Sequence, residues 1–282
     1  MAKTILITGA TDGLGRGLAL RLAGDGHSVL VHGRDPERTR AVADQIGARA
    51  RQYVADLSSL DEVRGLAEEV LAREDRLDVL INNAATASRE RRSSADGHEM
   101  AFAVNYLSHF LLTHRLLALL ERSAPSRIVN VSSVGQVPIS FDDVMLEQKY
   151  SAVRAYSQSK TAQVMFTFEL APRLPKGVTV NALHPATFMD TKMVREAFGK
   201  AMSTVEEGVA STVRLAMDEG LSEVTGRYFD RERESRADKQ AYDPEARKRL
   251  WKLSEELTGC RWGAEGAARS RGRQEERLAP SR

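Results

Sequence analysis

Short runs rich in β-branched residues alternate along this chain with longer segments whose apolar residues recur every three or four positions. The short runs are typical of strands and the longer segments of amphipathic helices. The predicted strands are 4–8, 28–33, 50–56, 78–84, 127–133 and 177–185, with a possible seventh at 226–229. The predicted helices are 13–23, 36–47, 60–74, 96–120, 151–173, 205–218 and 244–257.

Strands that alternate with helices predict βαβ units. Because such crossovers are right-handed, they place the strands in one parallel sheet with helices on both faces. We therefore expect an α/β fold in three layers, α/β/α, with about seven strands in a doubly wound sheet. One domain over residues 1–258 accounts for all of these elements.

Composition narrows the class of protein. The chain has 282 residues, of which 42% are hydrophobic and 28% charged, which suits one substantial core. Its one cysteine, Cys260, excludes an internal disulfide framework, and no apolar run approaches the roughly 20 residues needed to cross a bilayer. The near balance of 41 basic and 39 acidic residues gives no reason to expect nucleic acid or membrane as a partner. We expect a cytoplasmic protein.

The last residues differ from the rest. After Thr258 the chain holds few large apolar side chains, and residues 261–282 contain six arginines against three glutamates. This composition predicts a disordered, arginine-rich tail over 259–282.

A glycine-rich turn follows the first predicted strand and opens the first predicted helix. Glycines in such a turn let backbone N–H groups approach a pyrophosphate, which then lies at the positive end of the helix dipole. In this strand-turn-helix context the motif predicts nucleotide binding. Its residues include Gly9, Thr11, Asp12, Gly13, Leu14 and Gly15.

The end of the second predicted strand bears on the choice of dinucleotide. A carboxylate there favours NAD, because it binds the ribose hydroxyls, whereas an arginine accommodates the 2′-phosphate of NADP. The chain has Arg34 at this place, and Asp35 comes one position later. We therefore expect NADP(H) as the cofactor.

Tyr156 and Lys160 are four residues apart in a predicted helix and therefore lie on the same face. A tyrosine with an ordinary pKa near 10 is a poor acid-base catalyst at neutral pH, but a neighbouring ammonium stabilises the phenolate and lowers that pKa. A hydroxyl from the upstream "VSS" can hold a substrate carbonyl while the tyrosine gives it a proton. Only one of Ser132 and Ser133 can face the substrate, because adjacent strand residues point opposite ways.

These motifs occur in an order that resembles the short-chain dehydrogenase/reductase family, from Lys3 to about Thr258. Within it the chain is most similar to the NADP-preferring branch of retinol dehydrogenases, light-dependent protochlorophyllide reductase and carbonyl reductases. The resemblance implies a Rossmann-type fold and no metal. The matching stretches are "TGATDGLG", "ADL" (55–57), "NNAA" (82–85), "VNYLSHF" (104–110), "IVNVSSVG" (128–135), "YSQSK" and "HPATFMDT" (184–191).

Carried over to this chain, the resemblance implies a catalytic set of Asn105, Ser133, Tyr156 and Lys160. Tyr156 would be the general acid in reduction, Lys160 would bind the nicotinamide ribose, Ser133 would hold the substrate, and Asn105 would hold a water of a proton relay. The other residues implied to bind the cofactor are Asp56, Leu57, Asn83, Ala84, Pro185, Thr187 and Thr191.

The chain departs from the family pattern at two glycines, which are here Ala85 and Ala186. The second change lies in a turn next to the nicotinamide, where alanine cannot adopt positive φ without strain. The hydroxyl that usually contacts the carboxamide comes five residues after Pro185, whereas Thr191 comes six after it, so Thr187 and Thr191 both remain candidates.

The resulting hypothesis is an NADPH-dependent reductase of a ketone or aldehyde, which also runs the reverse alcohol oxidation. Loops near 136–150, 186–204 and 230–243 are expected to cap a small substrate. The apolar residues in these loops suggest a hydrophobic one, such as an intermediate of natural-product biosynthesis; they are Val137, Ile139, Phe141, Met189, Met193 and Phe198. The alternatives are a non-catalytic NADP sensor or interaction protein, and an epimerase or dehydratase on the same fold. The pattern does not decide between a monomer and a homo-oligomer.

Overall fold

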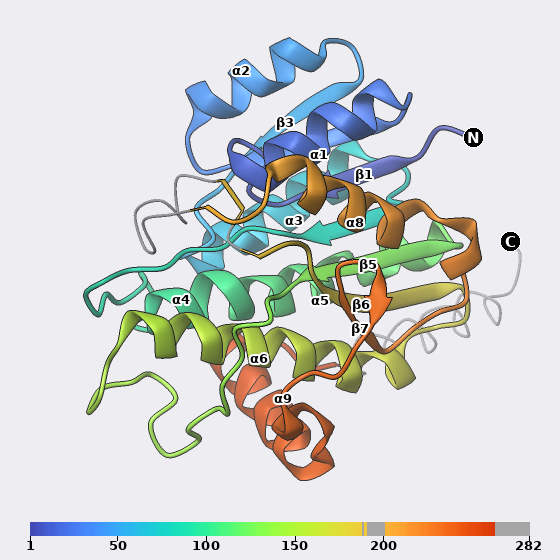
Figure 1. The fold of residues 1–282 in the computed structure, drawn as a ribbon. Coiled ribbons are helices and arrows are strands. Elements are labelled where there is room, and N and C mark those ends of the chain that lie inside the picture. Colours follow the sequence, from blue (N-terminus) through green and yellow to red (C-terminus); the bar gives the residue numbers. More distant parts are fainter. Residues whose placement is uncertain (188, 191–200, 263–282) are drawn as a thin grey trace, which may run out of the picture.

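The strands form one sheet with the order β3-β2-β1-β4-β5-β6-β7-β8 in the computed structural model, which describes residues 1–187, 189–190 and 201–262 (Figure 1). Every neighbouring pair from β3 to β7 is parallel, and only β8 runs antiparallel to its neighbour. The strands are β1 Thr4–Ile7, β2 Ser28–Gly33, β3 Ala50–Val54, β4 Val79–Asn82, β5 Ser126–Val131, β6 Val178–His184, β7 Arg227–Asp230 and β8 Arg233–Glu234. The predicted α/β sheet is confirmed.

Helices cover both faces of this sheet and bury a core on each side (Figure 1). On one face pack α1 Gly13–Gly24, α2 Pro36–Ile46 and α8 Val205–Met217; on the other pack α3 Leu60–Arg73, α5 Ser108–Arg122 and α6 Ala152–Leu170. The last helix, α9 Pro244–Thr258, packs outside α6. Because both faces are covered, the central strands are apolar throughout, as Val79–Ile81 are.

The predicted helix 96–120 begins later than expected and changes its winding. Glu99 ends the preceding loop, and its carboxylate accepts hydrogen bonds from the N–H groups of Ala101 and Phe102. The first turn, α4 Met100–Phe102, is followed by the π-helical η1 Ala103–Leu107, and only then by α5. A single π-helical turn of this kind is common at functional sites, and this one contains Asn105.

Two further differences concern short elements. The sheet has an eighth strand because the chain turns back after β7 at Arg231, whose φ is 55°. The long helix predicted at 151–173 ends at Leu170 and continues as a short 3-10 turn, η2 Ala171–Arg173, which contains a proline. Neither change could be read from apolar spacing, since both depend on local backbone geometry.

The loop 136–150 is fastened to the rest of the molecule. Gln158 of α6 accepts from Ser140 N and donates to Val144 O, while Gln240 in the 3-10 turn η4 Lys239–Tyr242 pairs with both backbone groups of Ile139. Two of the predicted capping loops, 136–150 and 230–243, are therefore joined to each other.

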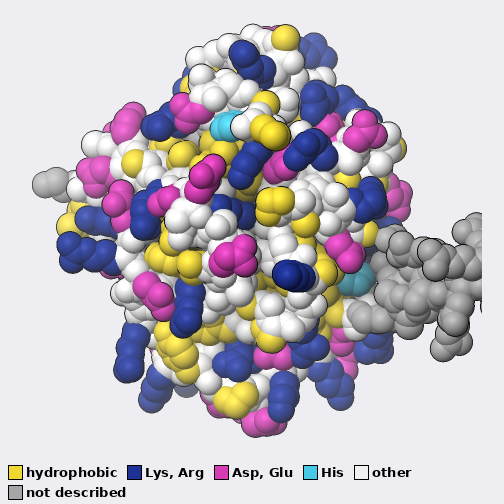
Figure 2. All heavy atoms as spheres, turned by 90° about the vertical axis from the view of Figure 1, so that its right-hand side faces the viewer, with side chains coloured by type: hydrophobic (Ala, Val, Ile, Leu, Met, Phe, Trp, Pro, Cys, Tyr) yellow, Lys and Arg dark blue, Asp and Glu magenta, His cyan; other side chains and the backbone are white. Residues whose placement is uncertain are grey.

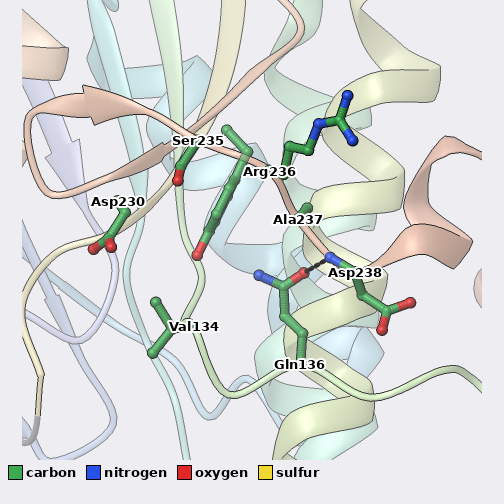
Figure 3. A pocket seen from close by; sticks show the side chains of 8 residues that line it. Val134, Gln136, Asp230, Ser235, Arg236, Ala237 and Asp238 are labelled. Carbon is green, nitrogen blue, oxygen red and sulfur yellow. Dashed lines mark hydrogen bonds between the residues drawn. The ribbon is translucent and has the colours of Figure 1, made fainter.

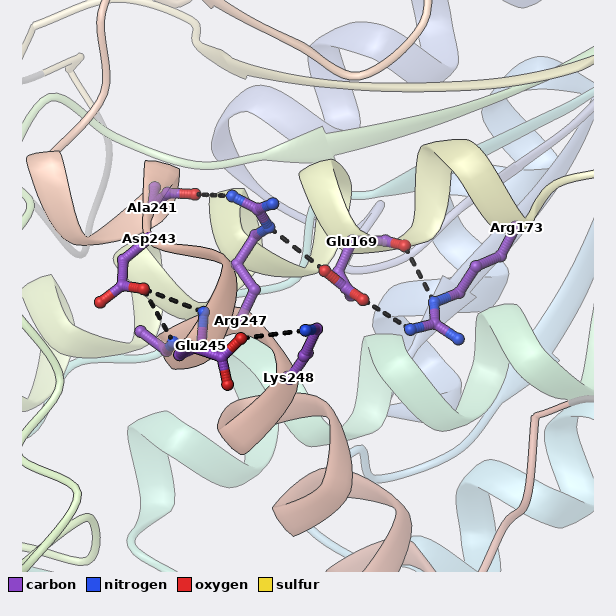
Figure 4. A network of polar contacts seen from close by, with 8 residues as sticks. Glu169, Arg173, Ala241, Asp243, Glu245, Arg247 and Lys248 are labelled. Atoms are coloured by element: carbon purple, nitrogen blue, oxygen red, sulfur yellow. Dashed lines mark hydrogen bonds and ion pairs between the residues drawn. The ribbon is translucent and has the colours of Figure 1, made fainter.

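Helix α9 is held to α6 by ionic and aromatic contacts. Figure 4 shows Glu169 of α6 between Arg173 and Arg247, with Arg247 donating to Glu169 Oε2 at 3.2 Å. Trp251 packs against Phe166 of α6 at 6.0 Å between ring centroids, and edge-on against Phe110 of α5 at 5.2 Å. The pair of Glu169 and Arg247 joins residues 78 positions apart in the chain.

The prediction of a disordered tail is wrong for its first residues, 259–262. Cys260 is buried, and the Trp262 ring lies 5.0 Å from the Trp251 ring and 5.6 Å from that of Phe110. Gly259, in the left-handed conformation, ends α9 and turns the chain back onto this aromatic cluster. The remainder of the tail, 263–282, lies outside the described residues.

The surface shows no separation of charge on the face seen in Figure 2, where basic and acidic side chains are interspersed. Among the helices of the described residues, none is both long and apolar enough to span a bilayer.

Candidate active site

The glycine-rich turn lies at the carboxyl edge of the sheet, where the strand order reverses between β1 and β4. Open α/β sheets bind ligands at such a switch point. Gly9 has φ 65°, and a Cβ on Gly15 would lie 2.1 Å from Gly9 O, so the turn and the first turn of α1 meet as only glycines permit. Asp12 caps α1 by accepting from Gly13 N at 2.7 Å. The predicted residues thus form a helix N-terminus suited to a pyrophosphate.

Asn83 holds this turn from the next strand. Its side-chain amide donates to Thr8 O at 2.8 Å and to Gly9 O at 3.2 Å, and its backbone N–H donates to the Thr8 hydroxyl. Ala84 N donates to the same hydroxyl at 3.0 Å. Asn83 and Ala84, both predicted to line the cofactor site, therefore meet the glycine-rich turn directly.

His32 is a site residue that the sequence did not single out. Its Nδ1 accepts from Gly9 N, and Nε2–H donates to Ala55 O at 3.1 Å, so the ring joins the turn to the end of β3. Burial lowers the pKa of His32 to about 4, which keeps the ring neutral and able to play both roles. Only its place at the end of a strand beside the turn would have indicated this contact.

The end of β2 carries exposed positive charge. Arg34 is exposed there, while the Asp35 carboxylate caps α2 by accepting from Glu37 N and Arg38 N. Arg38, one helical turn beyond Arg34, donates to Thr11 O and to Asp12 Oδ2 at 3.0 Å. Arg38 was not among the predicted residues, and it lies in the first turn of α2, where it contacts the glycine-rich turn.

The remaining predicted cofactor residues lie around the same edge. Asp56 is half-buried and accepts from Ser58 N, and Leu57 is buried beneath it. Pro185 is held through its carbonyl by Ser211, and the Thr187 hydroxyl lies 3.1 Å from His184 Nε2. Thr191, Met193 and Phe198 lie outside the described residues.

The two replacements of family glycines cause no backbone strain. Among the described residues, the only non-glycine positions with positive φ are Leu146 and Arg231, so Ala85 and Ala186 both take ordinary conformations. Ala186 is 4% exposed and packs in the turn after β6. A Cβ is therefore accommodated at both places.

Ser133, Tyr156 and Lys160 come together between β5 and α6. The hydroxyls of Ser133 and Tyr156 are hydrogen-bonded, and Lys160 Nζ lies 5.5 Å from the centre of the Tyr156 ring. Ser132 points the other way and donates to Lys160 O at 2.8 Å. The structure therefore places Ser133, rather than Ser132, beside the tyrosine, because the alternation of side chains continues past Val131, the last residue of β5.

The protonation of this pair differs from the expectation. Burial raises the pKa of Tyr156, an effect that the hydrogen bond from Ser133 opposes. Burial also lowers the pKa of Lys160 to about 7, and its Nζ donates to Val131 O and Gln163 Oε1, both at 2.8 Å. The predicted lowering of the Tyr156 pKa by the lysine is thus not found, because burial disfavours the charged form of each group.

Asn105 is fully buried in the π-helical turn. Its side chain accepts from Thr86 N at 2.7 Å and donates to Thr86 O and to the Ser159 hydroxyl. Ser159 in turn donates to Tyr156 O. Asn105 therefore ties the segment after β4 to the helix that carries the tyrosine and lysine.

A cavity of about 300 Å³ opens beside Val134 and Gln136, which follow Ser133 in the chain (Figure 3). Ser133 O accepts hydrogen bonds from Gln136 Nε2 at 2.7 Å and from Tyr228 OH at 2.9 Å, so two lining residues are fastened to the serine. The residues around the cavity are largely polar: Val134, Gln136, Tyr228, Asp230, Ser235, Arg236, Ala237 and Asp238.

The apolar side chains expected at the substrate do not line this cavity. Ile139 belongs to the core, with Phe141 packed against it, and Met189 packs on the opposite core cluster beside α1 and α8. Apolar residues in a loop are drawn inward by burial whatever the loop binds, so the packing of these three residues does not indicate the character of the substrate. Among the described residues, no group of histidine, cysteine and carboxylate side chains could hold a metal ion.

Comparison with known proteins places this site in a family. The family model for short chain dehydrogenase matches residues 3–201. Mouse retinol dehydrogenase 13 is 41% identical over 91% of this chain and 84% of its own length, and human retinol dehydrogenase 14 is 39% identical over 91% and 86%. The chain belongs to the short-chain dehydrogenase family, as its motifs implied, and is similar to the retinol dehydrogenases within it.

Solved structures agree with this assignment. A Mycobacterium paratuberculosis protein of uncharacterised function superimposes with a TM-score of 0.77 at 29% identity, covering 92% of this chain and 94% of that one. The Pseudomonas aeruginosa RhlG/NADP active-site complex gives a TM-score of 0.68 at 28% identity, covering 82% and 95%. Members of this family use NAD(P)(H), and the protein is an oxidoreductase acting on CH–OH and C=O groups.

Proposed function

We propose that the protein reduces a ketone or aldehyde with NADPH, and runs the reverse alcohol oxidation, using Ser133, Tyr156 and Lys160. The observation that carries this proposal is the hydrogen-bonded Ser133 and Tyr156 hydroxyl pair, with Lys160 beside the ring, at the edge of the sheet that carries the glycine-rich turn. A sensor that only bound the dinucleotide would have no use for this pair.

A bound reduced nicotinamide supplies the hydride in this family, and the protein does the rest. The Ser133 hydroxyl donates a hydrogen bond to the substrate carbonyl oxygen and fixes its position. Tyr156, which is protonated at neutral pH, then transfers its proton to that oxygen as the general acid. Lys160, as the ammonium, stabilises the phenolate left behind.

The preference for NADP(H) is supported by the charges at the end of β2. Arg34 and Arg38 carry positive charge there, while the nearest carboxylate, Asp35, is committed to capping α2. An arginine fork pairs well with a 2′-phosphate. The glycine turn at Gly9 and Gly15 and the N-terminus of α1 would hold the pyrophosphate.

The substrate is proposed to be a small carbonyl compound with a hydrophobic body, as the names of the retinol dehydrogenase relatives suggest. The polar lining of the cavity beside Ser133 favours a substrate that also carries a hydrogen-bonding group at that end. A role in natural-product biosynthesis would fit such a compound.

The test is the oxidation of NADPH and NADH with a panel of apolar aldehydes, ketones and quinones, each with a hydroxylated counterpart. We expect turnover with NADPH, and a loss of roughly 10²–10⁴-fold in kcat/KM for Tyr156→Phe, the usual contribution of a general acid. Binding of NADPH without turnover of any compound would instead favour the sensor.

The same assay tests the cofactor assignment. Arg34→Ala should raise KM for NADPH by about 10–100-fold, the value of a charge-assisted hydrogen bond, and leave KM for NADH nearly unchanged. Arg40→Ala removes another exposed arginine of α2 and serves as the matched control. A wild-type preference for NADH would refute the assignment of Arg34.

A further inference from the structure

Four buried polar side chains form one hydrogen-bond chain from the catalytic helix to the glycine-rich turn. Lys160 Nζ donates to Gln163 Oε1 at 2.8 Å, and Gln163 Nε2 lies 3.1 Å from His109 Nδ1. His109 Nε2 lies 3.3 Å from the Thr8 hydroxyl. Each of the four side chains is at most 1% exposed, and they belong to α6, α5 and the end of β1.

Lys160 determines which atoms donate and which accept in the next hydrogen bonds of this series. Lys160 Nζ donates to the carbonyl oxygen of Gln163 and thereby orients the Gln163 amide. The amide N–H₂ then faces His109 and makes Nδ1 the acceptor. With Nδ1 as the acceptor, the neutral ring carries its proton on Nε2, which faces the Thr8 hydroxyl at 3.3 Å. Burial, which lowers the pKa of His109 to about 3, keeps the ring in this neutral form.

Both ends of the chain reach the candidate site. The Thr8 hydroxyl also accepts the N–H groups of Asn83 and Ala84, at 2.9 and 3.0 Å, and so holds the cofactor side. At the other end, Lys160 Nζ has Val131 O as its second acceptor and lies beside the Tyr156 ring. Because buried polar groups are costly when unpaired, no member can move without a partner following it.

We propose that Gln163 and His109 are positioning residues that keep Lys160 and the cofactor-binding turn at Thr8 in a fixed relation through this chain. The inference rests on the proposed function, in that Lys160 and the turn contact the dinucleotide there. Neither residue touches the reacting atoms. When these hydrogen bonds are lost, Lys160 and the Thr8 hydroxyl are no longer held relative to each other, and the protein binds the dinucleotide more weakly.

The experiment measures the dissociation constant of NADPH by fluorescence titration, with kcat measured alongside, in three variants of the full chain. Gln163→Met keeps the shape of the side chain and removes its polar groups, while Gln163→Asn retains a shorter amide. Gln158→Met is the matched control, because Gln158 is also a 1% exposed glutamine of α6 but pairs only with the loop 136–150.

We expect Gln163→Met to raise the dissociation constant of NADPH roughly ten-fold, as for the loss of one to two hydrogen bonds. Gln163→Asn should restore part of the affinity, and Gln158→Met should bind NADPH like the wild type. Wild-type affinity in Gln163→Met, or an equal loss in Gln158→Met, would overturn the proposal, since the effect would then be absent or a general consequence of disturbing α6.

A second readout needs no cofactor. The ¹⁵N chemical shifts of the His109 ring should show the Nε2–H form in the wild type and a mixture of forms in Gln163→Met. A wild-type ring protonated on Nδ1 would refute the hydrogen bond from Gln163 to His109, and with it the proposal. If the wild type binds NADPH but reduces no carbonyl, the proposed function fails, whereas the ring shifts and the affinities still decide the role of Gln163.

Discussion

At the scale of single residues, the site is organised by buried groups whose protonation the fold controls. His32, His109 and His184 all have pKa values lowered by burial, so that each ring is neutral in the folded protein at neutral pH. Such groups couple the stability of the fold to pH, because the unfolded chain binds protons that the folded chain does not.

His32 provides a test of this coupling. Its pKa is about 4 in the folded protein against 6.5 in the unfolded chain, so its stabilising effect is complete above pH 6.5 and disappears as the pH falls to 4. The free energy of unfolding should therefore fall by about 3 kcal/mol over this range on account of His32 alone. His109 and His184 act in the same direction.

The measurement is urea unfolding of the wild type and of His32→Asn at several pH values between 4 and 7. The variant should be less stable at pH 7. Its free energy of unfolding should depend less steeply on pH than that of the wild type, by ~1.4 kcal/mol per pH unit, the contribution of one proton. His98→Asn, in the loop before α4, is the control for the removal of a histidine that does not contact the glycine-rich turn. Equal slopes in His32→Asn and the wild type would contradict the assignment of a neutral, buried ring.

At the scale of elements, helix termini place the chemical groups. Ser151 caps α6 by accepting from Arg154 N, and Tyr156 and Lys160 follow within the next three turns. Glu99 caps α4 in the same way just before the π-helical turn with Asn105. The caps decide where each helix starts and therefore which residues reach the site.

Ser151→Ala should lower the free energy of unfolding by about 1 kcal/mol, because the N–H of Arg154 loses its acceptor. Ser151 is exposed, so the change leaves no cavity, and Ser151→Asp should retain the stability. Urea unfolding at neutral pH compares the three proteins. An alanine variant as stable as the wild type would show that water replaces the cap without cost.

At the scale of the whole molecule, the site depends on how α9 and the residues after it close over α6. The aromatic cluster of Phe110, Phe166, Trp251 and Trp262 lies behind the catalytic helix, on the side away from the sheet. Glu169 and Arg247 join the two helices within the same layer (Figure 4).

A double-mutant cycle measures this link. Glu169→Gln and Arg247→Met should show a coupling free energy on the order of 1–2 kcal/mol, since both side chains are largely buried at 12% and 20% exposure. The exposed pair Glu245 and Lys248 within α9, changed to Gln and Met, should give roughly 0.3 kcal/mol. Equal coupling in the two pairs would mean that burial adds nothing to the contact.

The sequence by itself determined the strands, most of the helices and the family. Apolar periodicity reports which face of an element is buried, and this local property predicted the parallel sheet and the shared face of Tyr156 and Lys160. The glycine-rich turn was equally readable, because its requirement for glycine lies in the backbone of a few adjacent residues. The boundaries at residues 96–100 and the ordered end near Trp262 were not, since caps and packing outweigh spacing there.

Only the tertiary structure decided which buried polar groups meet. It put Ser133 rather than Ser132 next to Tyr156, brought His32 to Gly9, and joined Lys160 to Thr8 through Gln163 and His109. Thr8 and His109 are 101 positions apart, and His109 and Gln163 are 54 apart. The pattern of apolar residues in the sequence shows only that a histidine or glutamine lies on a buried face of its helix or strand. The partner that makes its burial possible is chosen when distant elements pack, because a buried hydrogen bond depends on distance and angle in space.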